Sequence, residues 1–261
     1  MSQDPGYSFE NRFKTRLLDG QTQIGLWISI PNAFTTEICA TAGYEWLLLD
    51  GEHTPNDLQT TLAQLQAIGA FPHTQAVARP PIGDSVIIKQ LLDIGVQTLL
   101  IPMVDTAEQA LELVRATRYP PAGIRGVGYG TARVSRWDLR TDYPKLANDE
   151  VCLLVQAETQ TAMDNLDSIC AVDGVDGVFL GPSDLAAAYG HLGNPGHPDV
   201  QRVIERGIAT ILKHGKAPGI LTPDEKLAKH YLDLGAKFVA VGLDARVLAR
   251  GVRELRQRFG S

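Results

Sequence analysis

Short apolar runs alternate with longer stretches of helical periodicity along almost the whole chain. Residues 46–49 are apolar at every position, which is typical of a strand buried on both faces of a parallel sheet. The runs predict strands near Gln23–Ser29, Trp46–Asp50, Thr74–Arg79, Thr98–Pro102, Val151–Gln156, Gly177–Leu180, Pro218–Leu221 and Phe238–Val241. The periodic stretches predict helices near Ala33–Ala42, Asn56–Ile68, Asp84–Ile94, Thr106–Thr117, Thr161–Ile169, Pro198–His214, Pro223–Leu234 and Ala245–Phe259.

Strand and helix therefore alternate eight times in 261 residues. Such alternation implies parallel strands joined by crossover helices. A closed (β/α)8 barrel, the TIM barrel, typically needs about 250 residues. We therefore expect one barrel domain over residues 1–261, and an open doubly wound sheet is the alternative.

One irregular segment, residues 119–148, separates the fourth helix from the fifth strand. A connection this long in a compact domain is usually functional, as a lid or a subunit contact. We expect it to shape the side of the site that accepts a second substrate. Its Arg125 could hold a substrate carboxylate or contact a neighbouring subunit, and the sequence does not separate these two roles.

Polar groups follow three of the predicted strands at the point where each strand ends. Asp50, Glu52 and His53 follow the second strand. Gln156 and Glu158 close the fifth strand, and residues 181–184, Gly-Pro-Ser-Asp, follow the sixth. Parallel α/β folds keep their chemistry at the carboxyl ends of the strands. These acids, amides and the imidazole are therefore predicted to share one rim.

Glu158 and Asp184 are the predicted metal ligands, because they leave adjacent strands at the same end. Two carboxylates with room for water and a chelating substrate suit Mg²⁺ or Mn²⁺. The alternative is a pair of solvated loop acids. No lysine lies within the eight predicted strands, so a Schiff base formed from a strand lysine is disfavoured and activation of a carbonyl by a metal is favoured.

His53 and Arg79 are the predicted proton-transfer and anion-stabilising groups. Imidazole is a base near neutral pH, as proton abstraction requires. Arg79 ends the third strand, where its fixed donors could hold an oxyanion. The alternatives are an exposed structural histidine and a surface ion pair.

Composition narrows the class of protein. The net charge of −6 argues against a nucleic-acid binder. No apolar run is long enough to span a bilayer, and residues 1–20 contain no apolar signal-peptide core. The three cysteines form no CxxC pair, which favours a reduced, cytoplasmic location.

The motifs resemble the divalent-metal, class II hydroxy-oxo-acid aldolases. The resemblance is near full length and is most specific in Asp50-Gly51-Glu52-His53 and in Arg118-Tyr119-Pro120-Pro121-Ala122-Gly123-Ile124-Arg125-Gly126. It implies a (β/α)8 barrel in a homo-oligomer, often a hexamer, with the last helix swapped between neighbours. The implied activity is reversible cleavage of 4-hydroxy-2-oxo acids to pyruvate, or a related 2-oxo acid, and an aldehyde, with Mg²⁺, Mn²⁺ or Co²⁺ as cofactor.

The resemblance also implies a role for individual residues. The family's metal ligands match Glu158 and Asp184, its base matches His53, and its enolate-stabilising arginine matches Arg79. Gln156 and Ser183, with Asp184, match substrate-contacting positions, although a close relative has alanine at position 183. The acid that raises the basicity of the histidine matches Asp93, whereas Asp50 is nearer in sequence.

Two kinds of alternative function stay open. One is another carbon–carbon enzyme on the same barrel, such as a sugar-acid (2-dehydro-3-deoxy acid) aldolase or a citryl-CoA lyase-like enzyme. The other is a non-catalytic protein that binds oxo acids. Both are expected to act on small molecules, without nucleic acid or membrane.

Overall fold

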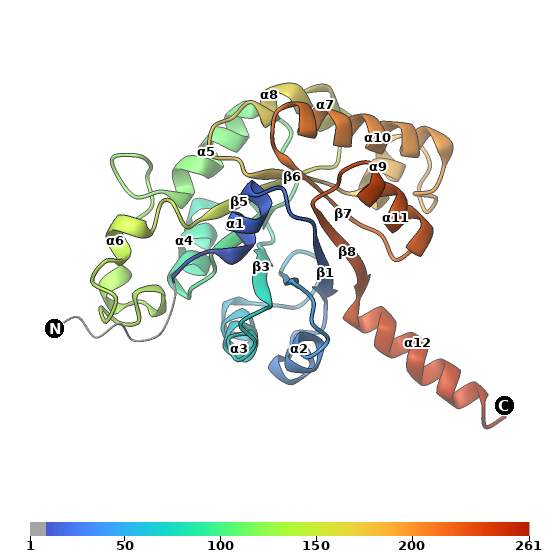
Figure 1. The fold of residues 1–261 in the computed structure, drawn as a ribbon, viewed down its shortest axis with the longest axis horizontal. Helices are drawn as coiled ribbons and strands as arrows, with labels where there is room; N and C mark the ends of the chain where they lie inside the picture. Colours follow the sequence, from blue (N-terminus) through green and yellow to red (C-terminus); the bar gives the residue numbers. More distant parts are fainter. Residues whose placement is uncertain (1–8, 261) are drawn as a thin grey trace.

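The eight strands form one closed parallel barrel (Figure 1). The structure, a computed structural model, describes residues 9–260. Residues 1–8 and 261 belong to the predicted single domain but lie outside the described residues. Residues 1–8 are also part of the segment in which the sequence predicts no signal peptide. Each strand pairs in parallel with the next, and β1 pairs with β8. The TIM-barrel prediction is confirmed and the open doubly wound sheet is excluded. The strands are β1 (Gln23–Ile28), β2 (Trp46–Asp50), β3 (Gln75–Arg79), β4 (Thr98–Ile101), β5 (Cys152–Ala157), β6 (Gly177–Leu180), β7 (Ala217–Leu221) and β8 (Phe238–Leu243).

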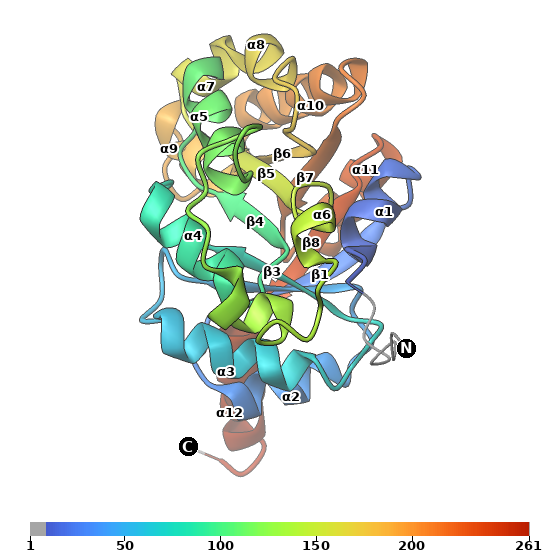
Figure 2. The same cartoon turned by 90° about the vertical axis from the view of Figure 1, so that its left-hand side faces the viewer.

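Helices surround the barrel (Figures 1 and 2). They are α2 (Ala33–Ala40), α3 (Leu58–Ile68), α4 (Ser85–Asp93), α5 (Ala107–Thr117), α7 (Gln160–Asp164), α8 (Leu166–Cys170), α9 (Pro182–Ala188), α10 (Pro198–Lys213), α11 (Glu225–Asp233) and α12 (Asp244–Gln257). The predicted helix 161–169 is two short helices, because the chain leaves helical geometry at Asn165.

Strand side chains alternate between two apolar layers. Those pointing outward, such as Leu47, pack against the helices, whereas those pointing inward fill the barrel. Trp46, Phe179 and Phe238 are almost completely buried in this interior. The rings of Trp46 and Phe179 each lie 6.1 Å from that of Phe238. The barrel is therefore a packed core rather than a pore.

A helix that the sequence analysis did not predict, α1 (Arg12–Leu18), packs at the amino-terminal end of the barrel. Its Phe13 is fully buried, and the ring lies 6.0 Å from the rings of both Trp46 and Phe238. Leu17 belongs to the same cluster. Phe13 and Leu17, four residues apart on α1, thus extend the apolar interior of the barrel at its amino-terminal end.

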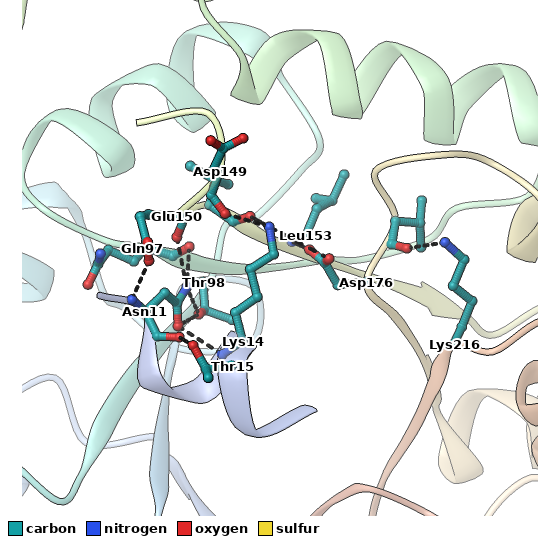
Figure 3. A network of polar contacts seen from close by, with 12 residues as sticks. Asn11, Lys14, Thr15, Gln97, Thr98, Asp149, Glu150, Leu153, Asp176 and Lys216 are labelled. Carbon is teal, nitrogen blue, oxygen red and sulfur yellow. Dashed lines mark hydrogen bonds and ion pairs between the residues drawn. The ribbon is translucent and has the colours of Figure 1, made fainter. Parts of the chain in front are cut away.

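Polar contacts fix the start of α1 (Figure 3). The Asn11 side-chain amide donates to the main-chain oxygens of Gln97, at 3.1 Å, and Glu150, at 3.0 Å. It also donates to Thr98 Oγ1 at 3.0 Å. Lys14 Nζ donates to the main-chain oxygens of residues 149 and 151 at 2.7 and 2.9 Å. These bonds tie α1 to the starts of β4 and β5.

The long connection 119–148 lies at this same end of the barrel. It contains α6 (Tyr143–Leu146) and two 3₁₀ turns, Tyr129–Thr131 and Arg133–Ser135. Arg133 donates to the main-chain oxygen of Ile94, just before β4, at 2.7 Å. This connection was expected to shape the side of the site that accepts the second substrate. For a single chain that prediction is wrong, because the connection joins a helix to a strand and therefore lies opposite the carboxyl ends of the strands.

The last helix, α12, extends away from the rest of the molecule (Figures 1 and 2). Its apolar side chains Val247, Leu248, Val252 and Leu255 are each more than half exposed. Phe34 and Ile38 on α2 are also exposed. Within residues 9–260, no helix has the length and apolar character needed to cross a membrane.

Candidate functional site

A cavity of about 800 Å³ opens at the carboxyl ends of the strands. Six of the seven predicted site residues line it: His53, Arg79, Gln156, Glu158, Ser183 and Asp184. They come from the ends of β2, β3, β5 and β6. The rim predicted from the sequence therefore exists as one space. None of the residues that line it is a lysine.

Arg79 is held rigidly at the base of this cavity. Its Nε and Nη2 contact the two carboxylate oxygens of Asp50 at 2.9 and 2.8 Å. Its Nη1 lies 2.6 Å from Glu52 Oε2 and 3.3 Å from the Gln156 side-chain oxygen. The side chain is only 6% exposed. Such a two-pronged pair fixes the guanidinium plane in a way that a lysine could not.

Trp27 completes the support of Arg79 from β1. The guanidinium carbon lies 4.9 Å from the centre of a Trp27 ring, and Trp27 Nε1 donates to Asp50 Oδ2 at 3.2 Å. Burial alone would raise the pKa of Asp50, but the contacts with Arg79, Glu52 and Trp27 lower the pKa overall. Asp50 is therefore held in its charged form as the partner of Arg79.

Glu158 is a buried carboxylate in an electrostatically unfavourable place. Its side chain accepts from the Gln156 amide at 2.7 Å and from the Met103 main-chain N–H at 3.4 Å. Burial, then the charges of Asp184 and Glu52, raise the pKa of Glu158 to about 8. The nearby Arg79 opposes this shift only in part. A further positive charge near Glu158 would relieve the repulsion among these acids.

Asp184 lies in the first turn of α9 and is exposed to the cavity. The chain reaches it through Gly181, where a Cβ atom would lie 2.9 Å from Glu158 Cγ, closer than real contacts allow. Glycine thus lets the β6–α9 turn approach the Glu158 carboxylate. Two carboxylates that face one space and repel one another are a donor set suited to a hard divalent cation.

His53 lies on the β2–α3 loop at the open side of the cavity, with a side chain that is 69% exposed. The acid in contact with the imidazole is Glu52, whose Oε2 lies 3.8 Å from His53 Nε2. Glu52 therefore lies between His53 and Arg79. Burial raises the pKa of Glu52, and the positive charge of Arg79 opposes that rise.

Asp93 is not part of this cavity in the single chain. It ends α4, at the amino-terminal end of the barrel, and its Oδ1 accepts from Arg125 Nη2 at 2.7 Å. Arg125 is buried and lies 4.4 Å over the ring of Tyr119. The expected pairing of Asp93 with His53 is therefore not found within one chain. Arg125 pairs with Asp93 of α4 and packs on Tyr119 of its own connection, away from the cavity of the same chain.

Asp50, the alternative partner for His53, is committed to Arg79 and Trp27. Neither acid considered from the sequence contacts the imidazole among the described residues. From the sequence, Glu52 was only a neighbour of His53, and Trp27 was not a predicted site residue. The signal for Glu52 was its place in the same four-residue motif. Trp27 carried no such signal, because a tryptophan within a buried strand is expected in any core.

The chain is similar to known proteins over most of its length. The HpcH/HpaI aldolase/citrate lyase family model matches residues 23–250. The chain is 59% identical over 249 residues to a hydroxypyruvate/pyruvate aldolase from Cupriavidus necator, covering 95% of this chain and 92% of the relative. It is 58% identical over 252 residues to a 4-hydroxy-2-oxo-heptane-1,7-dioate aldolase from Escherichia coli, covering 97% and 96%.

A solved structure is similar over almost the whole chain. It is a protein of the same family from Burkholderia cenocepacia, with a TM-score of 0.92 and 38% identity, and the match covers 96% of this chain and 100% of that one. The chain belongs to the HpcH/HpaI aldolase/citrate lyase family. Its named relatives are aldolases, which are carbon–carbon lyases, so the resemblance read from the motifs is confirmed.

Proposed function

We propose that this protein is a divalent-metal aldolase that reversibly cleaves 4-hydroxy-2-oxo acids to pyruvate, or a related 2-oxo acid, and an aldehyde. The observation that carries the proposal is the convergence of His53, Arg79, Glu158 and Asp184 on one cavity. The activities named for its relatives are of this class.

Glu158 and Asp184 would hold the cation, which we propose to be Mg²⁺, Mn²⁺ or Co²⁺. When bound, it would supply Lewis-acid polarisation of the oxo-acid carbonyl. The Gln156 amide, which donates to Glu158 at 2.7 Å, would orient that carboxylate. Ser183, in the same turn as Asp184, would contact the substrate.

Arg79 would stabilise negative charge on the oxygen of the enolate. Its Nη2 carries two N–H groups, and only one is needed for the contact with Asp50 at 2.8 Å. The second N–H is therefore available to an oxygen in the cavity. Because the guanidinium is already fixed by Asp50, Glu52 and Gln156, it would need no rearrangement during the reaction.

His53 would move the proton on the carbon next to the carbonyl. Its exposed ring on a loop can reach a bound donor directly or through a water molecule. In the cleavage direction the same group would take the proton of the 4-hydroxyl. Holding donor and aldehyde together in the cavity contributes the remaining rate advantage through orientation.

We also propose that the enzyme is a homo-oligomer, a hexamer by family resemblance, in which α12 packs on a neighbouring subunit. The exposed apolar face of α12 and its position away from its own barrel support this arrangement. The cytoplasmic location and the single-domain organisation stay predictions from the sequence.

Exchange of the pyruvate methyl protons with deuterium tests the proposal. The enzyme is treated with a chelator, dialysed, and then supplied with Mg²⁺, Mn²⁺ or Co²⁺, and exchange is followed by NMR. We expect exchange to disappear with the metal and to return on its addition. Glu158→Gln should stay inactive, whereas Asp167→Asn, a surface acid paired with Lys213, is the matched control.

Each alternative predicts a different result. A protein that only binds oxo acids would give no exchange under any condition. A citryl-CoA lyase-like enzyme would cleave a carbon–carbon bond in a CoA-linked substrate, and a sugar-acid aldolase would prefer polyhydroxylated aldehydes in an acceptor panel. Undiminished exchange in the metal-free enzyme would refute the role of the cation.

A further inference from the structure

Two of the six histidines of the chain lie together in the loop that joins α9 to α10. His191 lies three residues after the end of α9, and His197 is the N-cap of α10. Their rings are stacked, with centroids 3.5 Å apart and planes 14° apart. Asp199, in the first turn of α10, faces both rings: its Oδ2 lies 3.4 Å from His191 Nε2 and 3.7 Å from His197 Nδ1. The proposed aldol reaction uses none of these groups.

The donor atoms of this cluster are those of a transition-metal site. One nitrogen of each histidine and one oxygen of Asp199 lie within 4.8 Å of one another, and no other three such side chains in residues 9–260 come this close. Ligands that lie about 2.0–2.1 Å from a tetrahedral ion are about 3.3 Å from one another, which is close to the two separations from Asp199 Oδ2. Imidazole nitrogens suit Zn²⁺, Cu²⁺ and Ni²⁺, whereas Mg²⁺ prefers oxygen ligands.

The surroundings present these donors in a form that can bind an ion. The Asp199 main-chain N–H donates to His197 Nδ1 at 3.2 Å, so this nitrogen carries a lone pair, as a ligand must. Arg202 contacts the other carboxylate oxygen, Oδ1, and so orients Asp199. A cavity of about 460 Å³ beside His191 and Asp199 has room for the water that completes a site with three protein ligands. Arg202 and Arg206 also line this cavity, so binding has to depend on the imidazoles rather than on negative charge alone.

The loop between the two histidines also forms part of the wall of the catalytic cavity. Gly193, Pro195 and Gly196 line that cavity. His191 and His197 lie on either side of these three residues in the sequence. An ion bound by both histidines would therefore join the two ends of this loop and restrict its movement at the mouth of the catalytic cavity.

We propose that His191, His197 and Asp199 form a second metal site, which takes Zn²⁺ or a similar transition-metal ion and holds this loop in place. On binding, the two rings turn out of their parallel stack so that their lone pairs converge, and His197 Nδ1 exchanges its main-chain hydrogen bond for the ion. The site is separate from Glu158 and Asp184, whose oxygen donors suit Mg²⁺ or Mn²⁺. It does not depend on the proposed aldol reaction.

Calorimetric titration of Zn²⁺ tests the site in the full chain carrying Glu158→Gln, which removes a ligand of the other site. We expect one Zn²⁺ to bind per chain in the presence of excess Mg²⁺. Adding His191→Asn or His197→Asn should weaken this binding by about 100-fold or more, since loss of a group that merely supports a ligand already costs about 10–100-fold. Asparagine is a good N-cap, so α10 keeps its start in the second of these variants. His230→Ala, which removes an exposed histidine paired with Glu205, is the matched control.

Two further measurements report on the ligands and on the loop. Bound Cu²⁺ should show nitrogen splitting in its electron paramagnetic resonance spectrum, and His191→Asn should reduce that splitting. Hydrogen exchange followed by mass spectrometry should slow for the main-chain amides of residues 190–197 when Zn²⁺ is added, and His191→Asn should abolish this effect.

Zn²⁺ affinity that is unchanged by both His191→Asn and His197→Asn, or a Cu²⁺ spectrum without nitrogen splitting, would overturn the second metal site. Zn²⁺ binding that leaves hydrogen exchange of residues 190–197 unchanged would overturn the effect of the ion on the loop. The proposed reaction is decided separately, by the exchange of pyruvate protons, so failure of one proposal is distinguishable from failure of the other.

Discussion

Glu158 should make the metal-free protein less stable as the pH rises. Its pKa is raised from the ordinary 4.5 to about 8 by burial and by Asp184 and Glu52, and the residue is only 4% exposed. Between these two values the folded chain holds a proton that the unfolded chain has lost. Stability from this group is therefore fully present below pH 4.5 and is lost as the pH rises through about 8.

The size of the loss follows from the interval between the two pKa values. One proton contributes about 1.4 kcal/mol for each pH unit, so the full interval corresponds to at most about 5 kcal/mol. Glu158→Gln keeps the acceptor for the Gln156 amide but cannot ionise. The difference in unfolding free energy between the variant and the wild type should therefore grow in favour of the variant from pH 5 to pH 9.

Urea unfolding in the presence of a chelator measures this difference. Glu37→Gln, which removes one exposed carboxylate from α2, is the matched control. Addition of Mg²⁺ or Mn²⁺ at pH 8–9 should restore stability to the wild type more than to Glu158→Gln, because a ligand that binds only the folded state stabilises it. A pH-independent difference between Glu158→Gln and the wild type would refute this account of the Glu158 environment.

Four further changes have defined outcomes. Gly181→Ala places a methyl group against Glu158 and should weaken Mn²⁺ binding about tenfold in calorimetry without altering the circular dichroism spectrum; unchanged affinity would contradict the close approach of that turn. Arg79→Lys keeps the charge but loses the two-pronged contact, so pyruvate exchange should slow by about 10² or more, and a twofold effect would refute its role. Asn11→Ala removes the three hydrogen bonds that the side-chain amide donates and the N-cap bond that it accepts from Lys14 N–H, and should cost about 2 kcal/mol of unfolding free energy in urea. Val252→Glu charges the exposed face of α12 and should lower the mass seen by light scattering; an unchanged assembly would argue against packing through that face.

The strand positions could be predicted from the sequence because parallel strands buried on both faces are mostly apolar. All eight lie within two residues of the expected limits. The helix α1 was missed because its apolar residues, Phe13 and Leu17, lie among charged ones in a segment that looked uniformly polar. Phe13 and Leu17 are buried because they cover the amino-terminal end of the barrel interior, and no local sequence pattern reveals that end.

The site residues could be predicted because each one ends a buried strand, and such ends meet in a parallel barrel. Two predictions are not met within one chain, for one reason. Asp93 ends α4 and the connection 119–148 follows α5, and each leads to the start of a strand, so the topology places both at the opposite end of the same barrel. Distances between side chains could not be predicted either. Arg79 pairs with both Asp50 and Glu52 and so determines where the two carboxylates lie. As a result Glu52, rather than Asp50 or Asp93, lies nearest to His53.

The position of α1 has a consequence for the order of events during turnover. Because α1 packs into the amino-terminal end of the barrel, donor and aldehyde have to enter past the same side, over His53 and the loops at the strand ends. The oxo acid, which belongs beside the buried Glu158, must then arrive first, and in cleavage the aldehyde must depart before pyruvate can. Product-inhibition patterns should accordingly be those of a compulsory sequence, with pyruvate competing directly with the substrate for the free enzyme and the aldehyde not.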